Sequence, residues 1–276
     1  MDTSDLGMRM KEYEDANKVY LTRRIPVMIR VDGRAFHTYT KGFERPFDKI
    51  LTDAMQMTMK YLCENIPGCV LGYTQSDEIS LLLIDYKTRN SGAWYNYVRR
   101  KVETAAASMA TMAFNQMFSE IVMRRSIIEL SECENDFDKV VIMDKYEKYM
   151  RKAGWASFDA RAFNIPEFEV ENEFIWRQSD CVRNSIQSVG HANFTDKELD
   201  HKNMNMIQDM LMTQKGINWN NFPVHLKRGS CCIKVPKVFN EGTEKEFTRN
   251  KWTIDTNIPI FTQDRSYISN CIVIEK

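Results

Sequence analysis

One short stretch of the sequence constrains the fold more than any other: an apolar run that ends in an aspartate and a glycine. Residues 25–31 read Ile-Pro-Val-Met-Ile-Arg-Val, a composition typical of a buried strand. Asp32 and Gly33 follow directly. A carboxylate at the end of a buried strand is unfavourable unless a positive group meets it, and glycine leaves room for a sharp turn or a ligand. The stretch therefore predicts a strand end that presents a carboxylate to a cation.

A second acidic site lies in a predicted hairpin. Asp77 and Glu78 stand between two apolar, strand-like runs, 70–73 and 79–83. Successive side chains of a strand point to opposite faces, so we expect only one of these two acids to bind a ligand directly. We choose Asp77, because Ser76 precedes it on the turn side, where a phosphate would lie.

Together the two strand ends predict a metal site. Mg²⁺ is bound through carboxylates, backbone carbonyls, water and substrate phosphates, and Asp32, the Gly33 carbonyl and Asp77 supply such a set. A pair of divalent ions suits phosphoryl transfer. The alternative is that both acids are loop carboxylates in solvent. If they prove close, a cation between them is the simplest explanation, since like charges repel.

Basic residues around these acids could neutralise a triphosphate. They are Arg30, Lys41, Arg45 and Lys101. Taken singly, each is better explained as a surface charge, and they gain weight only as a group beside the acids. His37 could touch a triphosphate or a base, although a histidine in this position is more often a structural hydrogen-bond partner.

Composition excludes several classes of protein. The chain has 276 residues, 43% of them hydrophobic, so it can bury a full core, and its formal net charge is zero, so any surface for nucleic acid must be local. Seven cysteines without a Cys-x-x-Cys pair predict free thiols in a reducing cytoplasm, and four histidines at irregular spacing argue against zinc. No apolar run of 18 residues and no apolar N-terminus occurs, so we expect neither a membrane span nor a signal peptide.

The order of predicted elements indicates the fold class. A helix over about 3–22 precedes the first strand, and from there to residue 165 the pattern is β-α-β-β-α-β, with helices over about 48–65 and 93–118. This is the ferredoxin-like order of polymerase palms, an antiparallel sheet with two helices on one face, in an α+β fold. We therefore predict a palm-like catalytic domain over 1–165 and a mainly helical, fingers-like region that contacts RNA over 166–276.

The predicted C-terminal region carries a basic segment. Its helices should span about 171–190 and 195–213, and short strands should lie at 230–235 and 271–274. Between 227 and 251 basic residues outnumber acidic ones, and Phe239, Phe247 and Trp252 lie among or next to them. The segment could contact an RNA backbone, but a solvated loop explains it equally well.

Five motifs, in the same order along the chain, resemble those of the histidine-tRNA guanylyltransferases. They are Arg-Val-Asp-Gly-Arg-Ala-Phe-His at 30–37, Phe43 to Asp48, Tyr-Thr-Gln-Ser-Asp-Glu at 73–78, Phe-Asp-Ala-Arg at 158–161 and Trp-Arg-Gln-Ser-Asp-Cys at 176–181. The Lys-Arg-Gly at 227–229 resembles a later family element more weakly. The resemblance implies a polymerase-like palm that adds nucleotides to the 5′ end of tRNA in the 3′-to-5′ direction.

The resemblance also implies roles for individual residues. Asp32, the Gly33 carbonyl and Asp77 match the ligands of two magnesium ions, and Glu78 matches a further required acid. Nucleotide-binding positions of the family match Arg30, Arg34, Ala35, Phe36, His37, Arg45, Asp48, Ser76 and Lys101. ATP first activates a 5′-monophosphate, and the 3′-hydroxyl of an incoming nucleotide, such as GTP, then attacks it. Members of the family are generally tetramers.

One departure points to a branch of the family. Eukaryotic members carry His-Ile-Asn-Asn after the Asp-Cys, whereas this chain has Val182-Arg183-Asn184-Ser185. This is more similar to the bacterial and archaeal guanylyltransferase-like branch, which repairs 5′-truncated tRNA by templated addition. We therefore expect template-dependent 5′-end repair rather than dedicated guanylation of histidine tRNA. A nucleotide cyclase on the same palm and a non-catalytic RNA-binding protein are the competing hypotheses.

Overall fold

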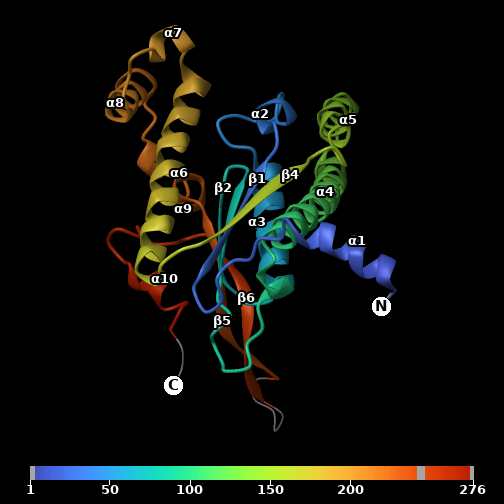
Figure 1. Cartoon of the computed structure of the whole chain (residues 1–276). Coiled ribbons are helices and arrows are strands. Elements are labelled where there is room, and N and C mark those ends of the chain that lie inside the picture. The colour runs from blue at the N-terminus through green and yellow to red at the C-terminus, as the bar shows by residue number, and fades with distance from the viewer. Residues whose placement is uncertain (1–3, 241–245, 274–276) are drawn as a thin grey trace.

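The computed structural model describes residues 4–240 and 246–273, and within them one antiparallel sheet runs through the molecule (Figure 1). Its strands follow the order β4-β1-β3-β2-β5-β6. They are β1 (Val27–Gly33), β2 (Cys69–Gln75), β3 (Glu78–Leu83), β4 (Phe158–Asn164), β5 (Ser230–Phe239) and β6 (Phe247–Asp255).

Helices of very different length surround this sheet. The α-helices are α1 (Asp5–Asp15), α2 (Phe36–Tyr39), α3 (Lys49–Asn65), α4 (Arg99–Glu132), α5 (Asp136–Met150), α6 (Val170–Asn193), α7 (Asp196–Leu199), α8 (Met204–Lys215), α9 (Val224–Arg228) and α10 (Ser266–Ser269). Short 3₁₀ turns are η1 (Trp94–Tyr97), η2 (Glu167–Glu169) and η3 (Trp219–Asn221).

The predicted fold class is confirmed. The elements β1, α3, β2, β3, α4 and β4 give the β-α-β-β-α-β order, and their strands lie in the sheet as β4-β1-β3-β2. The hairpin of β5 and β6 continues the same sheet, because β5 pairs with β2. The division of the chain at residues 165 and 166 stays a prediction.

Alternation along the strands produces two cores, one on each face of the sheet. Val27, Ile29 and Val31 are buried in the core that contains residues of α3 and α4. Met28, one step out of phase, is buried in the other core, which contains Phe174 of α6 and residues of the C-terminal segment. The sheet is therefore covered on both faces by apolar contacts, and a charged side chain on β1 or β3 must find a partner or lie at a strand end.

Several of the predicted elements are wrong in extent or type. The helix expected over 93–118 runs from Arg99 to Glu132, and the helix expected over 195–213 is divided into α7 and α8. The N-terminal helix ends at Asp15, because the chain beyond it is held by backbone contacts with the start of α4, such as that of the Leu21 N–H with the Tyr97 carbonyl (2.9 Å). The expected strand at 271–274 is not formed: Cys271 and Ile272 lie in a turn after α10, where Ile272 packs on the second core, and residue 274 lies outside the described residues.

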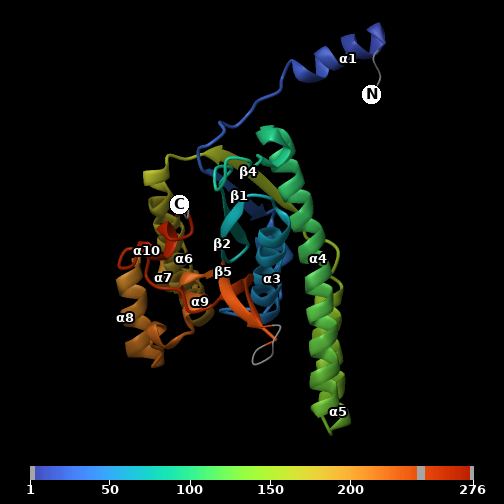
Figure 2. The same ribbon diagram turned by 90° about the horizontal axis from the view of Figure 1, so that it is seen from below.

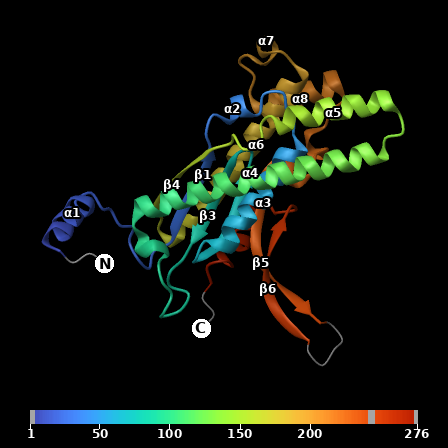
Figure 3. The same cartoon turned by 90° about the vertical axis from the view of Figure 1, so that its right-hand side faces the viewer.

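Three parts of the chain extend from the body. The helix α1 lies apart from it and buries none of its residues (Figure 2). Helices α4 and α5 form a long antiparallel pair, and the β5–β6 hairpin extends away from the sheet at another side (Figure 3). Within residues 4–240 and 246–273, no helix combines the length and the apolar character needed to cross a membrane.

The predicted basic segment forms much of this hairpin. Lys234, Lys237, Arg249 and Lys251 are exposed on its two strands. Lys227 is not part of this surface: it is buried, and its Nζ donates to the Asn220 carbonyl at 2.5 Å. Lys245 lies outside the described residues.

Candidate active site

The two predicted acidic strand ends meet through the backbone. β1 and β3 pair so that Asp32 lies opposite Glu78. One step further on, the Gly33 N–H donates to the Asp77 carbonyl at 3.0 Å. The two-residue turn of the β2–β3 hairpin, Ser76 and Asp77, therefore lies directly beside the end of β1.

Tight packing and unusual backbone angles fix this end of the sheet. Ser76 and Ala35 adopt left-handed conformations, with φ of 50° and 54°, which non-glycine residues rarely do outside constrained sites. A Cβ on Gly33 would lie 2.4 Å from the Phe36 ring, so only glycine fits there. The Phe36 ring packs in the core against Phe114 and Phe158, which anchors the chain just after the acid.

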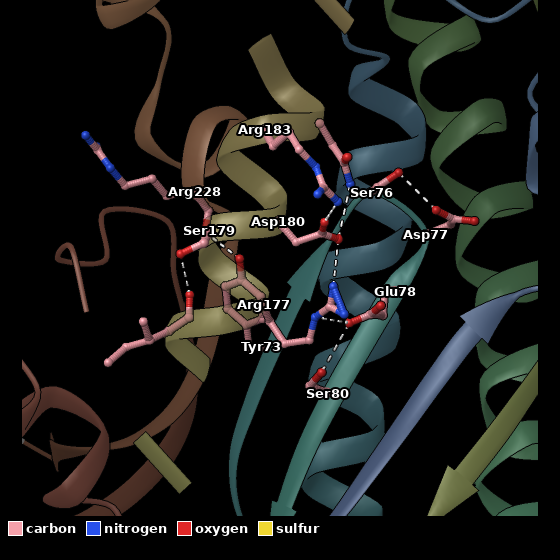
Figure 4. Close-up of polar contacts among 12 residues, drawn as sticks. Tyr73, Ser76, Asp77, Glu78, Ser80, Arg177, Ser179, Asp180, Arg183 and Arg228 are labelled. Carbon is pink, nitrogen blue, oxygen red and sulfur yellow. Dashed lines mark hydrogen bonds and ion pairs between the residues drawn. The ribbon is translucent and has the colours of Figure 1, made fainter. Parts of the chain in front are cut away.

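Glu78 is bound to a cation on the helix α6. Its Oε1 lies 3.2 Å from the Nε of Arg177, although the direction is not that of a hydrogen bond. The Nη2 of Arg177 lies 2.6 Å from the Oδ2 of Asp180, and Arg183 pairs with the other oxygen of Asp180. Figure 4 shows the resulting chain of charges, which runs from β3 to the outer side of α6.

Burial dominates the electrostatics of this network. The side chains of Arg177 and Glu78 are only 6% and 12% exposed. Burial raises the pKa of Glu78 to about 7, and Arg177 and Arg30 oppose this shift without cancelling it. Burial alone would lower the pKa of Arg177, but its contacts with Asp180 and Glu78 raise that pKa above its ordinary value.

Asp32 and Asp77 have a different environment. Both are half-buried, and within the described residues neither forms an ion pair with a basic side chain. Burial raises the pKa of Asp77, the negative charge of Asp32 raises it further, and a hydrogen bond from Ser76 Oγ (3.0 Å) opposes the shift. Figure 4 shows the Asp77 carboxylate beside Ser76 and turned away from Arg177.

Two hollows with shared lining residues lie near this turn, and the smaller one reaches it through Ser76. A cavity of about 140 Å³ is lined by Ser76 and by residues of the 46–48 loop, α3, α6 and α9, including Gln56, Asn184 and His225. An open pocket of about 670 Å³ shares Asp48 and Asn184 with it, and its size is within the range of ligand-binding sites. The site therefore combines acids at a turn with adjoining space for a ligand.

One segment of the chain supplies most of the basic side chains of the larger pocket. They are His37 of α2 and Lys41 and Arg45 of the loop that follows it, and His191 of α6 lines the pocket with them. Burial lowers the pKa of His225 in the smaller cavity, which favours its neutral form. The arrangement offers positive groups to an anion and two cation-free carboxylates to a metal.

Comparison with known proteins decides the family. A sequence model described as tRNAHis guanylyltransferase matches residues 7–166. A solved structure described as a bacterial tRNA(His) guanylyltransferase (Thg1)-like protein in complex with ATP is 40% identical, with a TM-score of 0.80 over 98% of this chain and 100% of that one. The chain belongs to the tRNA(His) guanylyltransferase family. Its members are nucleotidyltransferases, so the prediction of an enzyme of this class is confirmed.

Two further relatives are similar to this chain over most of its length. A bacterial Thg1-like structure in complex with GTP is 36% identical, with a TM-score of 0.73 over 98% of this chain and 99% of that one. The tRNA(His) guanylyltransferase of Debaryomyces hansenii is 24% identical over 85% of this chain and 82% of that protein. Both nucleotides expected from the motifs are thus bound by relatives of this guanylyltransferase-family chain.

Not every predicted nucleotide-binding residue lies at the acids. Lys101 is exposed near the start of α4. Glu103, two residues later, accepts from the Ala162 N–H, which is level with the middle of β1, while Thr111 accepts from the Phe158 N–H at the acidic end. Lys101 therefore lies toward the opposite end of the sheet, and its role stays a prediction.

Other predicted residues serve the fold through their side chains. Asp48 is buried and caps α3 by accepting from the Leu51 N–H at 2.8 Å. Arg30 lies on β1, with its guanidinium 5.7 Å from the ring centroid of Trp176, while Arg34 is exposed just after the strand. Phe36 is a core residue, so only its backbone could contact a nucleotide.

The residues Arg177 and Asp180 carry a role that the sequence did not reveal. Both lie in the motif at 176–181, but the sequence assigned no contact to either of them. Their spacing, together with Asn184, is i, i+3 and i+7, which places three polar side chains on one face of a helix. That spacing of polar side chains along one face of the helix was the available signal for a polar contact with the sheet.

The oxygen ligands that this chain can supply at the turn fit magnesium. No group of three or more His, Cys, Asp or Glu side chains within residues 4–240 and 246–273 is placed to hold a metal. Mg²⁺, however, is commonly bound by one or two carboxylates, with water and substrate phosphates completing its shell. Asp32, Asp77 and the Gly33 carbonyl match that pattern, and an ion there would oppose the effects of burial and of the Asp32 charge, which raise the pKa of Asp77.

Proposed function

We propose that this guanylyltransferase-family enzyme repairs the 5′ end of truncated tRNA, by adding nucleotides in the 3′-to-5′ direction with the opposite acceptor strand as template. The relatives that bind ATP and GTP and are 40% and 36% identical are described as bacterial Thg1-like proteins. The relatives named as tRNA(His) guanylyltransferases are less similar, at 24% identity for the Debaryomyces hansenii protein.

The observation that carries the choice of repair lies on α6. Val182 packs with the small apolar core between α6 and α8 and offers no polar group. The Ser185 hydroxyl donates to the Val182 carbonyl (2.9 Å) and accepts from Trp219 Nε1 (3.1 Å). At these two positions, where eukaryotic members carry His and Asn, this chain therefore keeps no free polar group for one particular tRNA.

A templated reaction does not need such contacts. Selectivity for one substrate depends on polar groups that are left unpaired by the wrong one. When base pairing with the opposite strand selects the nucleotide, the protein needs only backbone contacts and a catalytic centre. The exposed cations of the β5–β6 hairpin support this proposal as a surface for the phosphate backbone of RNA.

The chemistry assigns distinct tasks to the residues at the turn. Asp32, Asp77 and the Gly33 carbonyl would hold two magnesium ions, which when bound neutralise phosphate charge and activate a hydroxyl. Ser76 lies between the smaller cavity and Asp77, where it can donate to a phosphate oxygen. His37, Lys41 and Arg45 would bind the triphosphate of ATP or the incoming nucleotide in the larger pocket.

The proposed order of events is the one that the family resemblance implies. ATP adenylylates the 5′-monophosphate of the tRNA with release of pyrophosphate, and the 3′-hydroxyl of the incoming nucleotide then attacks the activated phosphorus and displaces AMP. The nucleotide is held with its triphosphate toward the basic loop and its base toward the cavity lined by Asn184 and His225. A cytoplasmic homotetramer is part of the same proposal.

The test compares two substrates. We expect kcat/KM to be higher for 5′-truncated tRNAs of several identities than for addition of an unpaired G to full-length histidine tRNA. The template base opposite the added position is varied, and the product should follow it. G insertion regardless of the template base, or a preference for full-length histidine tRNA, would favour a dedicated guanylyltransferase. Cyclic products from GTP alone would favour a cyclase.

A further inference from the structure

The loop that carries the cations of the larger pocket is held by the helix α5. The hydroxyl of Tyr149, near the end of α5, donates to Oδ2 of Asp48. Lys145, one turn earlier, lies 3.3 Å from Oε1 of Glu44. Lys152, just after the helix, donates to the Thr38 carbonyl at 3.4 Å. Three contacts from one element thus reach the loop at its start, middle and end.

The contact of Tyr149 is the buried one. Tyr149 and Asp48 are 4% and 6% exposed, whereas Lys145 and Glu44 face solvent. Asp48 Oδ2 also accepts from the Glu44 N–H at 3.0 Å, so the carboxylate closes the loop on itself and joins it to α5. The ring of Phe43 packs on Tyr149 with centroids 4.8 Å apart. Removing the hydroxyl would leave a buried carboxylate oxygen with one donor fewer.

The helix α5 does not reach the ligand space itself. The residues that line the two hollows include His37, Lys41, Arg45 and Asp48, but none of those from Asp136 to Met150. Any influence of α5 on a nucleotide must therefore pass through the loop.

We propose that Tyr149 is a positioning residue for the nucleotide: its hydrogen bond to Asp48 holds the 37–48 loop so that His37, Lys41 and Arg45 converge on the phosphates. The inference rests on the nucleotide pocket of the proposed function. A small displacement of the loop moves all three side chains together, and binding through several such groups depends on their being held in place beforehand.

The same helix provides a matched control. Tyr146 is 3% exposed, and its hydroxyl donates to Glu129 of α4 at 2.6 Å. Its hydrogen bond therefore stays within the α4–α5 pair and does not reach the loop. Y149F and Y146F each remove one buried hydroxyl from the same helix and keep the ring, so they differ in the partner that is lost.

The experiment measures ATP binding to the full chain without RNA, then KM and kcat for the nucleotide in 5′-end addition. We expect Y149F to weaken ATP binding and raise KM about fivefold to tenfold, with kcat within about twofold, and Y146F to change neither by more than about twofold. K145M, on the exposed side of the same contact, should shift KM in the same direction by less. The variants are compared at temperatures equally far below their own Tm.

Three outcomes would overturn the inference, and they are distinguishable. Equal affinity for ATP in Y149F and Y146F would show that the contact with the loop does not position the nucleotide, while the proposed function would stand. Failure of the unmodified chain to bind ATP would overturn the nucleotide pocket and with it the role of Tyr149. A loss in kcat at unchanged KM for Y149F would also contradict the positioning role.

Discussion

Asp77 and Glu78 are neighbours in the sequence, but the fold gives them opposite environments. Glu78 points to the face covered by α6, where Arg177 lies 3.2 Å away and Asp180 extends the network. Asp77 lies in the hairpin turn beside the end of β1, and its one side-chain hydrogen bond among the described residues comes from Ser76. Glu78 has its counter-charge within the chain, whereas Asp77 has none among the described residues.

This difference separates Glu78, which is paired inside the fold, from Asp32 and Asp77, which are available to a ligand. A buried carboxylate is stable only with a partner, and α6 supplies one for Glu78. Asp32 and Asp77 repel each other at a half-buried turn without a basic partner in the described chain. A fold keeps such a pair at a cost in stability, which is typical of functional sites. The following predictions test this separation.

The largest effect is expected at the two cation-free acids. D32A and D77A should each lower nucleotide addition by about a thousandfold or more, equivalent to roughly 4 kcal/mol, because a metal ligand is lost. Without magnesium, Tm should not fall, since removing either charge relieves repulsion. The measurement is the rate of 5′-end addition together with thermal unfolding in a chelator.

An exposed aspartate of α5 provides the control. D138A removes an exposed carboxylate from the first turn of α5 and should retain normal activity. Near-normal activity in folded D32A or D77A would contradict the metal site. A large drop in Tm without magnesium would show instead that these acids serve the fold, as Glu78 does.

The next effect is on stability at the paired acid. R177M leaves Glu78 and Asp180 buried without their cation and should reduce the free energy of unfolding by about 3–5 kcal/mol. R183M removes the other partner of Asp180. Because the Arg183 side chain is 56% exposed, this variant should change the free energy of unfolding by about 1 kcal/mol or less. Urea unfolding at neutral pH measures both.

A double variant sharpens this result. Replacing both partners of a buried ion pair is less harmful than removing one, so R177M with E78Q should recover part of the stability lost in R177M. Equal losses in R177M and R183M would mean that burial does not distinguish the two arginines, and the contrast between the paired and unpaired acids would lose its energetic basis.

Much of the fold followed from local patterns. The apolar runs around Asp32 and Asp77 predicted strands, and the order of elements up to residue 165 predicted the sheet, because alternation and turn residues are local properties. The sequence suggested that the two acids could meet but left open that both were loop carboxylates, and the pairing of β1 with β3 brings them together. The addition of β5 and β6 to the sheet did not, because pairing of β2 with a distant strand leaves no local signal.

Contacts between distant segments were the part that the sequence could not provide. Arg177 and Glu78 are about a hundred residues apart, as are Tyr149 and Asp48, and only the packing of helices on the sheet brings them together. The position of Lys101 shows the same limit: its place near the start of the predicted helix was visible, but not which end of the sheet that helix start would reach.

The smallest effect concerns magnesium and stability, and it separates the three acids most directly. A ligand that binds only the folded state stabilises it by about 1.4 kcal/mol at about ten times its Kd, which for a chain of this size raises Tm by roughly 2–5 °C. We expect this shift in the unmodified enzyme, measured against sodium at equal ionic strength. D32N and D77N should lose it, because each removes a ligand charge. E78Q should keep it, since Glu78 is directed to Arg177. The comparison uses the shift rather than Tm itself, because E78Q also alters the buried network. A shift that survives in D77N but disappears in E78Q would reverse the assignment of the two neighbours and make Glu78 the metal ligand.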